Sequence, residues 1–243
     1  MKKAAQHKAT LWLLPVTLGD TPVETVLPSY NLDVIRSLEY FIAEDLRSAR
    51  RFLRSAGYHG DLDPHKFQTL NEHTRENDFF DLVSWIQDRG VCGLLSESGL
   101  PCIADPGARL VQLARAAGIH IRPLSGPSSL FLALMASGFD GQHFTFHGYL
   151  PIDKSVRAQT IRELERNARQ GRGTQIFIEA PYRNNQMLAE LLRLCSPETW
   201  LCVASELTTP QEWIRADAIA SWKKSPVDLH KRNAVFLLAA YPQ

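Results

Sequence analysis

Hydrophobic residues in the first half of the chain form short runs that alternate with longer amphipathic stretches. A short apolar run bounded by turn residues predicts a buried strand, and an apolar position every three or four residues predicts a helix. Strands are expected near residues 10–16, 39–43, 91–95 and 119–123, and helices near 31–37, 45–56, 76–89 and 106–117. This alternation is typical of βαβ units around a mostly parallel sheet.

The helix expected at 106–117 has the clearest boundary signals. Asp105 is a residue type that accepts hydrogen bonds from the first free amides of a helix, and Pro106 suits the first helical position. Gly118 suits the turn that leaves the helix. We therefore expect Asp105 to cap this helix.

The turn Ser125-Gly126-Pro127-Ser128-Ser129 marks the expected junction between two domains, 1–124 and 125–243. Helices are then expected from the turn to about 137 and at 154–170 and 182–194, strands at 143–149, 174–178, 199–205 and 233–240, with 206–217 a candidate strand and a short helix before the last strand. The shorter links in this half favour antiparallel pairs. The predicted fold is thus α/β, with a mostly parallel N-terminal sheet and a mixed C-terminal sheet, each with helices.

The composition excludes several classes of protein. The chain has 243 residues, of which 44% are hydrophobic and 22% charged, as in ordinary globular proteins, and a formal net charge of +1. Its 4 cysteines form no CxxC pair, so no metal site is indicated. The apolar run from Leu11 to Val16 is interrupted by Pro15 and is too short for a signal peptide. No apolar run is long enough to span a membrane, and we expect a soluble, cytoplasmic protein.

The segment from Ser96 to Gly107 is the most informative candidate site. The chain has no GxxxxGK[ST], HExxH, GxSxG or GxGxxG motif. This segment, rich in small residues, follows an apolar run and leads into a predicted helix, so a ligand could approach its backbone closely and a negative group would be favoured at the helix end. A small polar cofactor with a carboxylate would fit. In the alternative interpretation, Asp105 and Pro106 only cap the helix and Gly99 only permits a turn.

Segments across nearly the whole chain carry a resemblance to a known family. Residues 96–107 resemble the motif SDAGTPGISDPG, Leu14-Pro15 with Gly19 resembles TPIGN, 43–47 resembles AEDTR, 71–73 resembles HEH, 125–129 resembles PGPSA, 148–151 resembles GFLP, 179–183 resembles ESPHR and 205–208 resembles RELTK. Together they resemble the tetrapyrrole methylase family, and within it the ribosomal RNA small-subunit methyltransferase I branch. Ser205 and Thr209 stand where that branch has arginine and lysine.

The resemblance implies a two-domain methyltransferase, usually a homodimer, that binds S-adenosylmethionine in a cleft between the domains. The cofactor-binding residues that it implies by motif position are Pro15, Gly19, Ser96, Glu97, Ser98, Gly99, Ile103, Ala104, Asp105, Gly126, Ser128, Ser129, Ala180, Glu206 and Leu207.

Two acidic residues are candidates for catalysis. Methyl transfer is an in-line displacement that needs a nucleophile held about 3 Å from the methyl group. If the acceptor is a ribose hydroxyl, a general base helps, because a neutral alcohol is a poor nucleophile. Glu44 and Asp45, at the end of the second predicted strand, are the candidate catalytic residues. Alternatively, the pair only favours the start of the next helix, with Asp45 as its N-cap.

Two arginine stripes could contact a polyanion such as RNA. Arg47, Arg50, Arg51 and Arg54 are spaced to share one helix face, and the candidate substrate-binding residues are Arg47, Arg50, Arg54 and, separately, Arg183. The second stripe comprises Arg162, Arg166 and Arg169, with Lys154, Arg157 and Arg172 nearby. Because Glu163 and Glu165 interleave with it, a solvated charged face is an equal alternative.

Three functions remain open at this point. The leading one is an S-adenosylmethionine-dependent methyltransferase that modifies the 2′-hydroxyl of a ribose in ribosomal RNA. The second is a methylase of a small molecule such as a tetrapyrrole-like compound. The third is a non-catalytic relative that binds the cofactor or RNA without turnover.

Overall fold

A computed structural model describes residues 9–225 and 227–240. The chain divides between Pro127 and Ser128 into two compact units, here called unit 1 and unit 2. Each unit contains its own five-stranded sheet. The predicted α/β fold is confirmed, because the strands of unit 1 are parallel and those of unit 2 form a mixed sheet.

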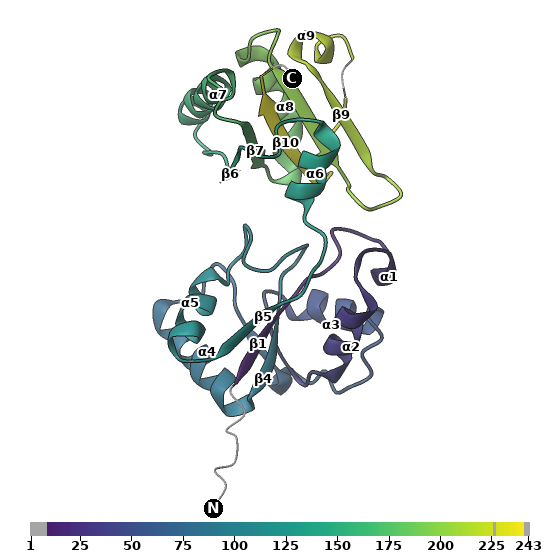
Figure 1. Cartoon of the computed structure of the whole chain (residues 1–243), viewed down its shortest axis with the longest axis vertical. Helices are drawn as coiled ribbons and strands as arrows, with labels where there is room; N and C mark the ends of the chain where they lie inside the picture. The colour runs from purple at the N-terminus through teal and green to yellow at the C-terminus, as the bar shows by residue number, and fades with distance from the viewer. Residues whose placement is uncertain (1–8, 226, 241–243) are drawn as a thin grey trace, which may run out of the picture. The chain divides into compact units, whose positions relative to one another are not determined.

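Unit 1 is built from alternating strands and helices (Figure 1). Its strands are β1 (Thr10–Leu14), β2 (Tyr40–Ala43), β3 (Phe67–Thr69), β4 (Val91–Leu95) and β5 (His120–Pro123). Its helices are α1 (Val23–Val26), α2 (Ser29–Ser37), α3 (Leu46–Ser55), the 3-10 turn η1 (Pro64–Lys66), α4 (Glu76–Arg89) and α5 (Ala108–Ala116). The sheet order is β3-β2-β4-β1-β5.

Different helices cover the two faces of the unit 1 sheet. Successive side chains of a strand point to opposite faces. Leu14 of β1 accordingly packs with residues of α1, α2 and α3, and Leu11 packs with residues of α4 and α5. Both faces of the sheet are therefore buried, as parallel sheets require.

The connections of two neighbouring strands diverge at one edge of this sheet. β1 and β4 pair in parallel register up to Leu14 and Leu95. The chain leaves β1 toward the helices of one face and leaves β4 toward α5 on the other face. Because open α/β sheets bind ligands where neighbouring connections diverge, the fold favours a site at the carboxyl ends of β1 and β4.

Unit 2 has the sheet order β6-β7-β10-β8-β9, in which β6 and β7 are parallel and the other neighbours antiparallel. Its strands are β6 (Phe144–Tyr149), β7 (Thr174–Ile178), β8 (Trp200–Ser205), β9 (Trp213–Ala218) and β10 (Ala234–Ala239). Its helices are α6 (Ser129–Ser137), α7 (Lys154–Arg169), the 3-10 turn η2 (Pro181–Arg183), α8 (Asn184–Leu194) and α9 (Ile219–Trp222).

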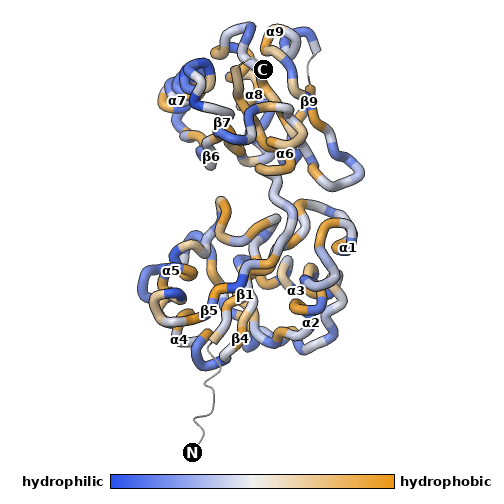
Figure 2. Tube along the Cα trace, in the orientation of Figure 1, coloured by the Kyte–Doolittle hydropathy of each residue, from blue (hydrophilic) through white to orange (hydrophobic). Residues whose placement is uncertain are grey.

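The core of unit 2 lies between its sheet and the helices α7, α8 and α9. Phe177 and Phe236 stand opposite each other on β7 and β10 and stack with ring centroids 5.6 Å apart. A buried ion pair joins α7 to α8, in which Arg157 donates from Nη2 to Glu190 Oε1 at 2.7 Å and from Nε to Glu190 Oε2 at 2.8 Å. In Figure 2, α7 is mostly hydrophilic and α6 mostly hydrophobic.

The expected start of the helix at 106–117 is wrong. The helix α5 begins at Ala108, its N-cap is Gly107, and no side chain caps it. Asp105 and Pro106 belong instead to a series of turns in which Cys102 and Ala104 adopt positive φ angles of 70° and 61°. These conformations turn the chain before the helix can start. Gly118, at φ 78°, does follow the helix as expected.

Most other elements lie where the pattern predicts them. The short elements α1, η1 and β3 were not expected, and the candidate strand within 206–217 is confirmed as β9. None of the helices in the described part of the chain has the length and apolar character needed to cross a bilayer.

Candidate active site

Three predicted cofactor segments pack together within unit 1. The backbone amide of Val16, just after β1, donates to Gly99 O at 2.9 Å. A Cβ atom on Gly126 would lie 2.2 Å from Pro15 Cβ, so only glycine fits there. Asn31 Nδ2 donates to Ser125 O at 2.6 Å and holds the same segment. The segments after β1 and β4 and the turn at 125–127 thus form one tightly packed group.

The backbone of the loop from Ser96 to Gly107 is available to a ligand. Among the amides of described residues 97–107, only that of Ile103 donates to a backbone carbonyl, Leu100 O at 3.4 Å. Gly99, Cys102, Ala104 and Gly107 all have positive φ angles, so the chain changes direction repeatedly. Ile103 and Ala104 are exposed. A loop of this kind can present amide groups to a carboxylate or to a nucleoside.

Carboxylates from two strand ends lie near this loop. Burial, followed by the charges of Glu44 and Glu97, raises the pKa of the half-buried Asp105 to about 6. Burial also raises the pKa of Glu44, with further contributions from the charges of Glu97 and Glu72. A group of carboxylates that repel one another favours either protonation or a bound cation. The site is therefore suited to a ligand with a positive centre.

Asp45 is committed to the start of α3. Its Oδ1 accepts hydrogen bonds from Ser48 N at 2.8 Å and from Ser48 Oγ at 2.7 Å, and these bonds lower the pKa of Asp45. Ser48 Oγ also lies 2.8 Å from Glu97 Oε1. The structure therefore places Asp45 as the N-cap of α3, which was the alternative interpretation, and Ser48 connects this cap to the loop after β4.

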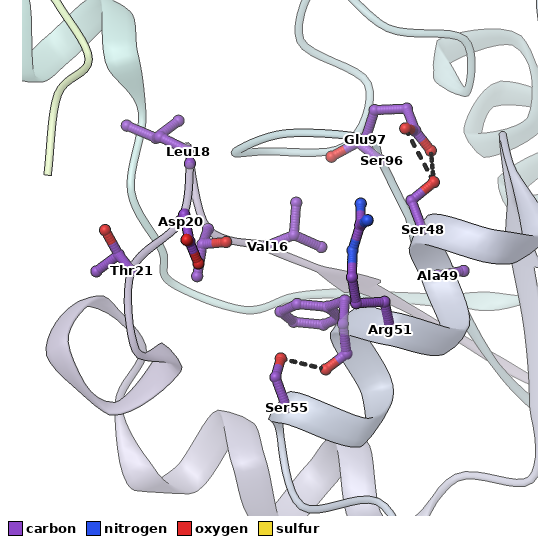
Figure 3. A pocket seen from close by; sticks show the side chains of 13 residues that line it. Val16, Leu18, Asp20, Thr21, Ser48, Ala49, Arg51, Ser55, Ser96 and Glu97 are labelled. Carbon is purple, nitrogen blue, oxygen red and sulfur yellow. Dashed lines mark hydrogen bonds between the residues drawn. The ribbon is translucent and has the colours of Figure 1, made fainter. Parts of the chain in front are cut away.

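A cavity of about 570 Å³ opens beside this loop (Figure 3). It is lined by the segment after β1 (residues 16–21), by one side of α3 and by Ser96 and Glu97. Its walls combine apolar side chains such as Val16 and Phe52 with hydroxyl groups and a single basic side chain, that of Arg51, which extends from α3 into the cavity in Figure 3. Gly19, a predicted cofactor residue, also lines it.

The predicted arginine stripe on α3 has two different roles. Arg50 donates from Nε to Leu62 O at 2.8 Å, and Arg54 donates from Nη1 to Tyr58 O at 2.6 Å, so both hold the segment that follows the helix. Arg47 and Arg51 are exposed and make no such bond among the described residues. Arg51 belongs to the predicted stripe but was not among the candidate substrate-binding residues. Its spacing of four residues from Arg47, which puts both on one helix face, was the signal that could have selected it.

The site residues predicted in unit 2 are placed as follows. Arg183 forms an ion pair with the buried Glu179, at 2.5 Å from Nη2 to Oε1, and its guanidinium lies 5.7 Å from the ring centre of Tyr182. Ala180 donates its amide to the same Glu179 oxygen at 2.7 Å. Glu206 has a positive φ of 50° and the following Leu207 is buried. A cofactor role for these residues, and for Ser128 and Ser129 at the start of α6, stays a prediction.

The four cysteines and one cluster of possible metal ligands do not form a further reactive site in the described part of the chain. Burial raises the pKa of Cys92, Cys195 and Cys202 to about 12 and that of the half-buried Cys102 to about 11, so all four thiols stay protonated at neutral pH. Asp61, Asp63 and His65 have potential ligand atoms within 4.8 Å of one another, but all three are exposed, and no further observation indicates a metal ion.

Known proteins resemble this chain in sequence and in fold. A family model described as tetrapyrrole (corrin/porphyrin) methylases matches residues 31–221. The chain is similar to a ribosomal RNA small subunit methyltransferase I of Vibrio cholerae, at 30% identity over 95% of this chain and 77% of the relative, and to one of Escherichia coli O157:H7, at 26% identity over 99% and 81%. The crystal structure of a uroporphyrin III C-methyl transferase from Thermus thermophilus has a similar fold, with a TM-score of 0.56, 17% identity, and coverage of 95% of this chain and 97% of that one.

The family model describes methylases, and the relatives are methyltransferases. The protein is an enzyme of this class. The family match extends over most of the chain, from α2 to α9. The chain belongs to the tetrapyrrole (corrin/porphyrin) methylase family.

Proposed function

We propose that this protein transfers a methyl group from S-adenosylmethionine to the 2′-hydroxyl of a ribose in ribosomal RNA. The observation that carries the proposal is the site at the ends of β1, β2 and β4, where open loop amides and mutually repelling carboxylates lie beside a cavity of about 570 Å³. The names of the relatives from Vibrio cholerae and Escherichia coli support RNA as the acceptor.

The residues of the loop after β4 fit this cofactor. S-adenosylmethionine, when bound, supplies a methyl group activated on a positively charged sulfur. The free amides between Glu97 and Gly107 would hold its carboxylate or adenosine portion, and Asp105 and Glu97 would favour its positive groups. The tight packing of Gly126 on Pro15 keeps the adjoining backbone in place.

Glu44 is the proposed general base. A carboxylate with a raised pKa accepts a proton more readily, and burial together with the charges of Glu97 and Glu72 raises the pKa of Glu44. Glu44 follows β2 directly, next to β4 in the sheet, so it belongs to the same edge as the loop. Arg47 and Arg51 extend from the following helix and would contact RNA phosphates.

The proposal also includes the oligomeric state of the enzyme and its cellular compartment. We expect the active form to be a homodimer. Ribosomal RNA as the substrate would place the protein in the cytoplasm. Sedimentation of the purified chain and fractionation of cells test these two expectations.

Methyl transfer to small-subunit ribosomal RNA tests the proposed function directly. Radiolabelled S-adenosylmethionine should label the RNA, and alkali-resistant dinucleotides should identify the 2′-O-methyl group. Glu44→Gln is expected to lower kcat by about 100-fold or more, because general bases contribute about 10²–10⁴-fold, whereas Glu198→Gln, at an exposed position of unit 2, should not change it. Absence of label with the wild-type protein would refute the RNA acceptor, and an unchanged kcat in Glu44→Gln would remove Glu44 from the mechanism.

A further inference from the structure

The segment from Lys154 to Arg172 carries a concentration of positive charge that the proposed active site does not use. It contains six basic residues and two acidic ones, a net charge of +4, in a chain whose formal net charge is +1, and of the six only Arg157 is buried, in its ion pair with Glu190. The remainder of the chain is therefore net acidic. Positive charge collected on one element is the electrostatic signature of a surface that meets phosphates.

One of the two acidic residues is turned away from solvent. Glu165 is buried, and its Oε1 accepts hydrogen bonds from Ser196 N at 2.6 Å and from Thr199 Oγ1 at 2.5 Å. Its carboxylate therefore connects α7 to the segment before β8. Glu163 therefore remains as the one exposed acidic residue of this segment, which favours a phosphate contact over an evenly mixed charged face.

The exposed arginines of α7 line a common recess. This recess of about 300 Å³ is bordered by Arg162, Arg166 and Arg169, together with Glu165 and Gln170. Arg169 donates from Nη1 to Ser196 Oγ at 2.9 Å and is thereby oriented. Arg166 makes only a 3.5 Å exposed contact with Glu163, and Arg162 has no ionic partner among the described residues. At least one guanidinium is thus free, and a second is weakly paired.

We propose that this recess binds the phosphate backbone of the RNA substrate, as a second contact separate from the active site. Guanidinium groups bind phosphate oxygens through paired, charge-assisted hydrogen bonds. At a rise of 1.5 Å per residue, the three arginines span about 10 Å of the helix, so they reach more than one phosphate of a continuous strand. This inference rests on the proposed function for the identity of the polyanion.

Binding of protein-free small-subunit ribosomal RNA at several KCl concentrations tests the proposal. Arg162→Gln/Arg166→Gln is expected to weaken binding about tenfold or more at low salt and to reduce the slope of log affinity against log salt concentration by about 1.4–1.8, since each lost phosphate contact removes about 0.7–0.9. At saturating RNA, kcat should stay at the wild-type value while KM for RNA rises, because these residues lie outside the active site.

A matched pair of single variants controls for the general loss of charge. Arg162→Gln and Arg115→Gln each remove one exposed arginine that has no ionic partner among the described residues, the second from α5 in unit 1. Only Arg162→Gln should reduce the salt slope. Circular dichroism checks that both variants are folded. Equal slopes in both variants and the wild type would overturn the proposal.

Further outcomes distinguish RNA from other occupants of the recess, and the recess proposal from the proposed function. Displacement of RNA by inorganic phosphate at matched ionic strength would assign the recess to a small anion. An effect of the double variant only on assembled ribosomal subunits would assign it to a protein. Either result would overturn the RNA contact. If the wild type binds RNA with this slope but transfers no methyl group, the proposed function fails and the recess proposal stands.

Discussion

The carboxyl group of Asp105 gives the sharpest test of the electrostatics of the site. Its pKa of about 6 in the folded protein lies above the usual aspartate value of 3.8. The folded state therefore holds the proton more tightly than the unfolded state. The resulting contribution to stability is present at low pH and is lost as the pH rises through about 6. Asp105→Asn removes the charge that the folded protein disfavours at neutral pH.

The size of the effect follows from the pKa. A shift of about two units corresponds to about 3 kcal/mol, and partial exposure of the carboxyl reduces this to about 1–2 kcal/mol. We expect Asp105→Asn to make unit 1 more stable than the wild type by about this amount at pH 7.5 and equally stable below about pH 4. The same substitution should weaken S-adenosylmethionine binding about tenfold, because a hydrogen-bonding negative group is lost.

Two measurements check these opposite effects. Urea titration followed by hydrogen exchange of peptides from β1 and β4 reports the stability of unit 1 by itself, and calorimetry reports cofactor affinity. Asp81→Asn, at an exposed position of α4, removes the same charge away from the site, and it should leave both quantities nearly unchanged. A variant that is no more stable than the wild type at pH 7.5 would refute the argument that burial and the charges of Glu44 and Glu97 disfavour the ionised Asp105.

Two further predictions concern arginines with contrasting roles. Arg157→Ala leaves Glu190 buried without its partner, and we expect the free energy of unfolding of unit 2 to fall by about 3–5 kcal/mol. Urea unfolding measures this change, and a fall of less than about 1 kcal/mol would contradict the prediction. Arg51→Ala should raise KM for RNA at least several-fold without changing stability, whereas Arg54→Ala should lower stability through the lost bond to Tyr58 O. Steady-state methylation measures the first effect and thermal unfolding the second. Equal behaviour of the two variants would show that Arg51 does not contact RNA from the cavity.

The long elements could be predicted because local signals agree with their burial. The helix α4 occupies residues 76–89 as expected, since its apolar positions recur at helical spacing and Gly90, at φ 80°, ends it. The three-residue strand β3 was missed, because at the sheet edge it needs only one neighbour and leaves little periodic signal. Short elements depend on tertiary contacts that the sequence does not display.

The sequence indicated which loops form the candidate site, but not the role of each side chain in it. Arg50 and Arg54 have the same spacing as Arg47 and Arg51, and only the fold brings the carbonyls of Leu62 and Tyr58 within their reach. Asp105 has the sequence context of a helix cap, yet it lies in a series of turns after two positive φ angles, where burial and the charges of Glu44 and Glu97 raise its pKa. These roles depend on residues distant in the sequence.

The placement of the thiols provides a probe that needs no engineered label. Cys102 is the one partly exposed cysteine, and it lies within the loop after β4, whereas Cys92, Cys195 and Cys202 are buried. Because only the thiolate reacts quickly, a pKa of about 11 makes alkylation of Cys102 slow. The alkylation rate at this one position therefore reports on the loop in the natural sequence, and a ligand bound against the loop would lower the rate.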